Sequence, residues 1–142
     1  MTALLRPGLV LLAALHSVLG GWALFLPQSF YRDFPAPGHA WVAMFPPYNE
    51  HLLRDYGGLN LAFALIFGAC AIRPERLVVR VSLLGYECYA LPHLLFHLGH
   101  LRHFRAADAV GQTASLTLTA IAPPLLLTLS YAGATRPMAD NR

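Results

Sequence analysis

Long uncharged apolar runs constrain this chain more than any other feature of its sequence. The first, Gly8–Leu26, follows Arg6 and ends at Pro27. It is long enough to cross a bilayer, for which about 20 apolar residues are needed. A secretory signal peptide is the competing interpretation, but the run is long for one and no small-residue cleavage motif follows it. The run therefore predicts a membrane-spanning helix.

Three further segments have the same apolar character: Tyr56–Ile72, Val81–Leu98 and Val110–Tyr131. Of the 142 residues, 56% are hydrophobic and 12% are charged, against roughly 25% charged in an average soluble domain. We therefore expect an all-α fold, a four-transmembrane-helix bundle that forms one integral membrane domain over residues 1–142. Its helices are predicted at about 8–26, 49–72, 78–101 and 109–131, followed by a polar tail at 132–142.

The connection between the first two predicted spans, Gln28–Tyr48, is rich in proline and aromatic residues. Such rings concentrate at the headgroup level of a membrane. A short interfacial helix around Ala40–Phe45 suits this composition, and Pro46 and Pro47 would end it.

The second predicted span opens with a polar turn. Asn49 is a candidate N-cap, because its side chain can accept a backbone hydrogen bond at the helix start. Glu50 and Arg54 stand four residues apart, as do His51 and Asp55, so two polar pairs can form on this one helix. One turn beyond Tyr56, Asn60 needs a hydrogen-bond partner if it lies in lipid.

The third predicted span carries a polar stripe. His93, His97 and His100 stand at i, i+4 and i+7, and Tyr89 and Tyr86 extend the same helix face. Glu87 lies in the same span, and Pro92 is expected to kink it. In the first span, His16 is either a histidine bonded to a neighbouring helix or part of a buried polar site, since ionisable residues within membranes usually face a bundle interior.

Topology brings these polar groups together. With four spans, the start of the second and the end of the third lie on one side of the membrane. Asn49, Glu50, His51 and Asp55 can then approach the histidine stripe. Both termini share the other side, and the arginine distribution, with Arg6, Arg73, Arg76, Arg80, Arg136 and Arg142 on that side, favours cytoplasmic termini.

One interpretation of this cluster is a transition-metal site, because imidazole and carboxylate groups bind zinc, iron or copper. The candidate ligands are His93, His97, His100, His51 and Glu50, supported by Asn49, Asn60 and Tyr89. A second interpretation is acid/base catalysis on a lipid-soluble substrate, such as a quinone, a sterol-like lipid or an isoprenoid, with Glu87, His93 and Asp55 transferring protons. Whether the chain is an enzyme stays open.

The third interpretation is a non-catalytic accessory or assembly subunit of a larger membrane complex, in which the polar residues secure helix packing. Four-helix exporters, a further possibility, carry an essential Glu in the first span, where this chain has His16.

The net charge of +3 comes from scattered arginines, so we expect no nucleic-acid partner. Cys70 and Cys88 lack the spacing of a disulfide framework or a thiol oxidoreductase.

The segments SFYRDFP, PPYNEHLLRDYGGLNLAFAL and LPHLLFHLGHL resemble small four-span, DoxX-like bacterial membrane proteins. The likeness runs from about Leu11 to Leu127 and is most specific over Pro47–Asn60 and Pro92–His100. It implies a four-helix bundle, and some DoxX-type proteins are linked to quinone-coupled sulfur oxidation, although none of their catalytic residues matches a position here. Arginine- and alanine-rich usage without lysine is similar to that of high-GC bacteria, which implies a bacterial plasma membrane.

Overall fold

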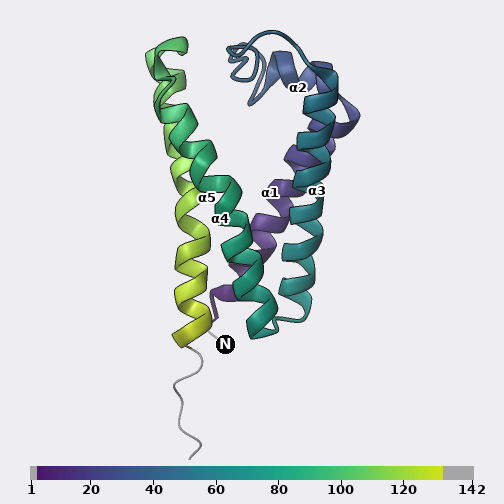
Figure 1. The fold of residues 1–142 in the computed structure, drawn as a ribbon, viewed down its shortest axis with the longest axis vertical. Helices are drawn as coiled ribbons and strands as arrows, with labels where there is room; N and C mark the ends of the chain where they lie inside the picture. Colours follow the sequence, from purple (N-terminus) through teal and green to yellow (C-terminus); the bar gives the residue numbers. More distant parts are fainter. Residues whose placement is uncertain (1–2, 133–142) are drawn as a thin grey trace, which may run out of the picture.

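The structure, a computed structural model, describes residues 3–132 and is helical throughout its regular elements (Figure 1). The predicted all-α class is therefore confirmed over the described residues. Beyond Ala132, the predicted polar tail lies outside them. The elements are α1 Leu5–Phe25, α2 Pro27–Asp33, α3 Glu50–Ile72, α4 Arg76–Leu98, the 3-10 turn η1 Leu101–His103, and α5 Ala106–Ala132.

Three helices among the described residues are long and apolar enough to cross a membrane. They are Leu5–Phe25, Glu50–Ile72 and Ala106–Tyr131. Helix α4 matches α3 in length, at 23 residues. It does not join the three, because Arg76, Arg80, Glu87 and its histidines make it more polar. Three of the four expected spans therefore have the length and apolar character that a membrane crossing needs, and the count of four stays a prediction.

The long helices form two pairs. Helix α1 packs along α3, and α4 packs along α5, with few contacts between the pairs. Figure 1 shows the pairs close together at the lower end, near the N-terminus, and apart at the upper end, where α2 and the following loop lie. The main apolar core fills the lower end and includes Leu9, Phe67, Val79, Leu83 and Leu126. A smaller cluster around Ala23, Phe30 and Leu53 packs α2 against α1 and α3 at the upper end.

Glycine allows α1 and α3 to approach closely. A Cβ atom placed on Gly20 would lie 2.8 Å from the carbonyl oxygen of Gly57, and one on Gly57 would meet the backbone nitrogen of Leu24. Small residues at helix crossings are the usual way for membrane helices to bring their backbones together. These two glycines therefore set the distance between the two helices.

The start of α3 has the predicted cap. The Asn49 Oδ1 accepts a hydrogen bond of 3.0 Å from the backbone N–H of Leu52. Arg54 pairs with Glu50 at 2.8 Å and also donates to the carbonyl oxygen of Leu24 at 2.6 Å. The last carbonyls of a helix have no partner within it, so Arg54 closes the end of α1 as well as the first turns of α3.

The short helix between α1 and α3 is α2, at Pro27–Asp33, and not the segment expected at Ala40–Phe45, which forms turns. Pro27 suits a first helical turn because its missing N–H is not needed there. In contrast, Gly38 and Ala40 both adopt positive φ, at 94° and 51°, which interrupts a helix. The loop after α2 is therefore irregular and continues to Asn49.

Candidate functional site

A cavity of about 600 Å³ lies between the two helix pairs, toward their upper end. Cavities of this size commonly hold small molecules. Its wall is largely aromatic and aliphatic, with residues from all four long helices, from α2 and from the loop that follows α2. The apolar and aromatic members include Leu15, Leu19, Phe30, Tyr31, Phe34, Trp41, Phe45, Leu52, Leu53 and Leu116.

One face of α4 supplies a polar wall. Tyr86, Tyr89, His93 and His97 all line the cavity, so this part of the predicted stripe is confirmed as one helix face. The His93 ring stacks on Tyr89 with centroids 5.3 Å apart and meets His97 edge to face at 4.7 Å. The helix runs on through Pro92, which lies on the exposed side. The result is a continuous row of rings that can donate and accept hydrogen bonds.

His100, the last residue of the predicted stripe, does not line the cavity. Its Nδ1 donates to the carbonyl oxygen of Phe96 at 2.6 Å, and the ring stacks on Phe96 with centroids 4.2 Å apart. His103 donates in the same way to the carbonyl oxygen of His100 at 3.0 Å. The Phe96 carbonyl lies in the last turn of α4 and the His100 carbonyl just before η1, where backbone N–H groups three residues on, at Gly99 and His103, also donate to them at 3.2 Å. Their observed contacts are those of helix caps.

His16 of α1 and Asn60 of α3 form a buried pair across the close helix crossing. The Asn60 Nδ2 donates to the carbonyl oxygen of Tyr56 at 2.8 Å, which fixes the amide orientation and leaves Oδ1 facing His16 Nδ1 at 2.7 Å. An amide oxygen can only accept, so Nδ1 of His16 carries the proton and Nε2 is an acceptor. The Nε2 atom is buried and has no hydrogen-bond partner within residues 3–132. Both residues line the cavity, so the two interpretations of His16 apply together.

Helix α5 faces this wall with Gln112, Ser115 and Thr119, which recur at i, i+3 and i+7 and all line the cavity. Gln112 is 4% exposed, and its Oε1, like Nδ1 of His97, is buried without a hydrogen-bond partner among the described residues. These residues were assigned no role from the sequence. Their helical spacing was the signal that could have placed them opposite the histidines.

The charged residues at the start of α3 do not reach the cavity, which corrects the expected convergence. The side chains of Glu50, His51 and Asp55 are 54%, 87% and 63% exposed. Glu50 pairs with Arg54, and His51 pairs with Asp55 at 3.3 Å, as their spacing predicted. Asn49, from the same turn, does line the cavity. The pairing within α3 holds these charges on its outer surface.

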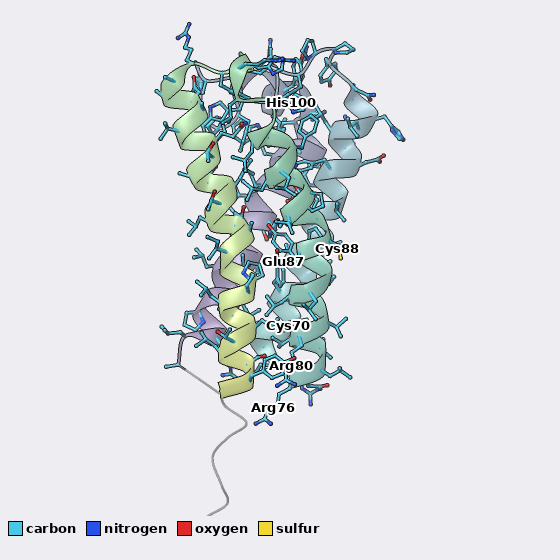
Figure 2. All side chains as sticks on the ribbon, turned by 60° about the vertical axis from the view of Figure 1, so that its left-hand side comes forward. Cys70, Arg76, Arg80, Glu87, Cys88 and His100 are labelled. Atoms are coloured by element: carbon cyan, nitrogen blue, oxygen red, sulfur yellow. The ribbon has the colours of Figure 1, made fainter. Side chains whose placement is uncertain are left out.

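Two further predictions, a metal site and proton transfer by Glu87, can be compared with the structure. Within residues 3–132, no three His, Cys, Asp or Glu residues form a group that could hold a metal ion, so the structure does not support the predicted zinc, iron or copper site. Glu87, a candidate for proton transfer, does not line the cavity; Figure 2 shows it part-way along the bundle, between His100 at the upper end and Arg80 and Arg76 at the lower end.

The loop after α2 forms the roof of the cavity, which sequence reasoning did not foresee. Trp41 lines the cavity and donates from Nε1 to Oδ1 of Asp108 on α5 at 2.8 Å. Nδ1 of His39 lies 2.6 Å from the same oxygen. Phe45 packs against the ring of His97 with centroids 5.3 Å apart. The loop thus bridges the α1/α3 pair, from which it extends, and the α4/α5 pair.

Electrostatically, the cavity is neutral apart from any proton taken up by its histidines. Among the described residues that line it, none is Asp, Glu, Arg or Lys. Its polar groups are hydroxyls, amides and imidazoles, which can donate and accept hydrogen bonds without formal charge. Chemically, the site can surround an apolar body and bind polar groups at its edge.

No known protein family, curated protein or solved structure matches this chain.

Proposed function

We propose that the protein binds a neutral, lipid-soluble, ring-containing molecule in the cavity between its two helix pairs. The observation that carries this proposal is the composition of the wall: aromatic and aliphatic over most of its extent, polar along one face of α4, and free of formally charged side chains among the described residues. Ligand pockets with a few directed polar groups in an apolar surface are typical of small-molecule sites.

The neutral wall selects against charged ligands. An ion moved from water into an apolar cavity without a partner of opposite charge loses much solvation energy. A carboxylate or phosphate group is therefore disfavoured inside this cavity. A hydroxyl or carbonyl group can instead bond to His93, Tyr89 or Gln112, while an attached ring packs against the aromatic wall.

We place the cavity within a four-span bundle. At 23 residues, α4 extends about 35 Å at 1.5 Å per residue, enough to cross a bilayer beside α5. Its tyrosines and histidines line the cavity, which accounts for much of its polarity. In the proposed orientation the lower end, with Arg6, Arg73 and Arg80, is cytoplasmic in a bacterial plasma membrane, following the positive-inside rule. The cavity is then nearer the outer leaflet.

His93 is the residue we expect to contact the polar group of the ligand. It lies midway along the polar wall, between Tyr89 and His97, and lines the cavity. A neutral imidazole offers one donor and one acceptor nitrogen, so it can bond to a hydroxyl or to a carbonyl group. Proton transfer to the ligand would use the same contact, so binding is the property to test before catalysis.

Three probes that share a nonyl tail and a benzene ring test this proposal: para-nonylphenol, nonylbenzene and para-nonylbenzoate. The purified protein is heated in detergent at matched probe fractions in the micelle. We expect para-nonylphenol to raise the melting temperature most, because a ligand at 100 times its Kd stabilises a protein by about 2.7 kcal/mol. Nonylbenzene should bind more weakly for lack of the hydroxyl, and para-nonylbenzoate least.

Substitution of His93 tests the contact itself. His93→Phe keeps a ring but removes both nitrogens, and we expect it to weaken para-nonylphenol binding about tenfold, the loss of one hydrogen bond. The matched control is His51→Phe on the exposed surface, which should leave binding unchanged. Equal stabilisation by all three probes would contradict the proposal. No stabilisation by any probe would favour the accessory-subunit interpretation.

A further inference from the structure

The roof of the cavity differs from its walls in how it is held. The walls are long helices, whereas the roof is the irregular loop 34–49, whose members Phe34, Trp41, Val42 and Phe45 line the cavity. Backbone in such a loop lacks the repeating hydrogen bonds of a helix and opens at lower energy than a packed helix. The roof is therefore the part of the enclosure that can move without separating two helices.

The loop is joined by the chain to α2 and α3, on one side of the cavity. It reaches the opposite pair through the Asp108 carboxylate in the first turn of α5. Figure 1 shows this loop at the upper end, where the two helix pairs stand apart. Both polar contacts fall on a single oxygen, Oδ1, of a side chain that is 13% exposed. One carboxylate thus joins two points of the roof to the far wall.

Aromatic packing also holds the loop 34–49 over the cavity. Phe45 contacts the rings of His97, Phe96 and Phe104, and the Trp41 ring lies against Gly111. These contacts have no fixed hydrogen-bond geometry and can slide. The hydrogen bonds to Asp108 are directional and involve a charged acceptor, which makes them stronger than bonds between neutral groups.

We propose that the loop 34–49 is a lid, and that the contacts of Trp41 and His39 with Asp108 form the latch that keeps it closed. Molecules enter and leave the cavity when the latch opens. The exchange of ligand rests on the proposed function, whereas the opening of the lid does not. The two parts can therefore be measured separately.

Lid opening is measured without any ligand. Trp22 and Trp41 are the two tryptophans of the sequence. In a Trp22→Phe background, all tryptophan emission comes from Trp41, and its quenching by aqueous acrylamide reports how often the lid exposes it. We expect Asp108→Asn to increase quenching strongly and His39→Ala, which removes one of the two contacts, to increase it less. The control Asp55→Asn removes the same charge at the same end of the molecule, but on α3 and outside the cavity, and should have no effect.

Ligand exchange is measured on the same variants with para-nonylphenol, by the change in Trp41 emission on dilution into probe-free detergent. We expect Asp108→Asn to speed release about tenfold, the factor that corresponds to about 1.4 kcal/mol. Entry should accelerate as well, so that the Kd changes much less than the release rate. His39→Ala, a substitution at a half-exposed side chain, should fold normally and show a smaller acceleration.

The outcomes are distinct. Unchanged quenching in both Asp108→Asn and His39→Ala would overturn the latch, whatever the probe does. Greater quenching with an unchanged release rate would overturn the lid as the route to the cavity. If the wild-type protein binds none of the probes while quenching rises as expected, the proposed function fails and the latch stands.

Discussion

Gly57→Ala is expected to lower the free energy of unfolding by about 3 kcal/mol, at the upper end of the cost of overpacking. The new methyl group would meet the backbone of Leu24, which cannot rotate away as a flexible side chain can. Helices α1 and α3 would have to separate, which would also strain the bond between Arg54 and the Leu24 carbonyl and the His16–Asn60 pair. The apparent melting temperature in detergent should fall by about 10 °C.

The neighbouring residue provides the control. Nothing lies within 4 Å of a Cβ atom built on Gly58. Gly58→Ala should therefore be neutral or slightly stabilising, because alanine is favoured over glycine in a helix by about 1 kcal/mol. Gly20→Ala should resemble Gly57→Ala, and Gly21→Ala should resemble Gly58→Ala, since each pair has one crowded and one open position. Equal melting temperatures for Gly57→Ala and Gly58→Ala would contradict the close helix crossing.

Helical periodicity made the polar face of α4 predictable. The positions of Tyr86, Tyr89, His93 and His97 on one face follow from 3.6 residues per turn, and the structure confirms that face. The end of the stripe was not predictable in this way. Where a helix stops, carbonyl groups need donors, and His100 binds one of them. A local backbone requirement thus explains a histidine that the periodicity alone assigned to the site.

Which face of each helix points into the cavity was harder to predict from sequence. Topology placed the start of α3 and the end of α4 at one end of the molecule, as observed (Figure 1). It did not determine how each helix is rotated about its axis, and rotation decides that Asn49 and Asn60 face the cavity while His51 and Asp55 face outward. That rotation follows from the close contact of α1 with α3, which depends on glycines that carry no chemical signal of their own.

The loop was the hardest part to foresee. Its contacts with Asp108 join residues 67 and 69 positions apart, and no periodic pattern links them. From sequence alone, Asp108 is an acidic residue near a helix start, a position that favours only a local role. The resemblance to DoxX-like proteins stays a prediction, as do catalysis and assembly with other subunits.

Asn60→Leu is expected to lower the free energy of unfolding by about 2 kcal/mol, because it removes the acceptor of His16 and leaves a buried N–H without a partner. Leucine has the same branched shape and is no smaller, so little of the loss should come from a cavity. His16→Phe should cost a similar amount, since it leaves Oδ1 of Asn60 unpaired while the ring still packs against Phe63 and Tyr86. Both residues are almost fully buried, at 0% and 2% exposure, so water cannot replace the lost bond.

The double variant His16→Phe/Asn60→Leu separates a hydrogen bond from a general packing effect. Replacing both partners of a buried hydrogen bond by apolar groups of similar shape can be nearly neutral. We therefore expect the double variant to be clearly more stable than the sum of the single effects predicts, with a coupling energy of about 1 to 2 kcal/mol. Melting temperatures of the four proteins in detergent provide the measurement. Strictly additive losses would show that the pair contributes volume and not a bond, and that the tautomer of His16 is not fixed by Asn60.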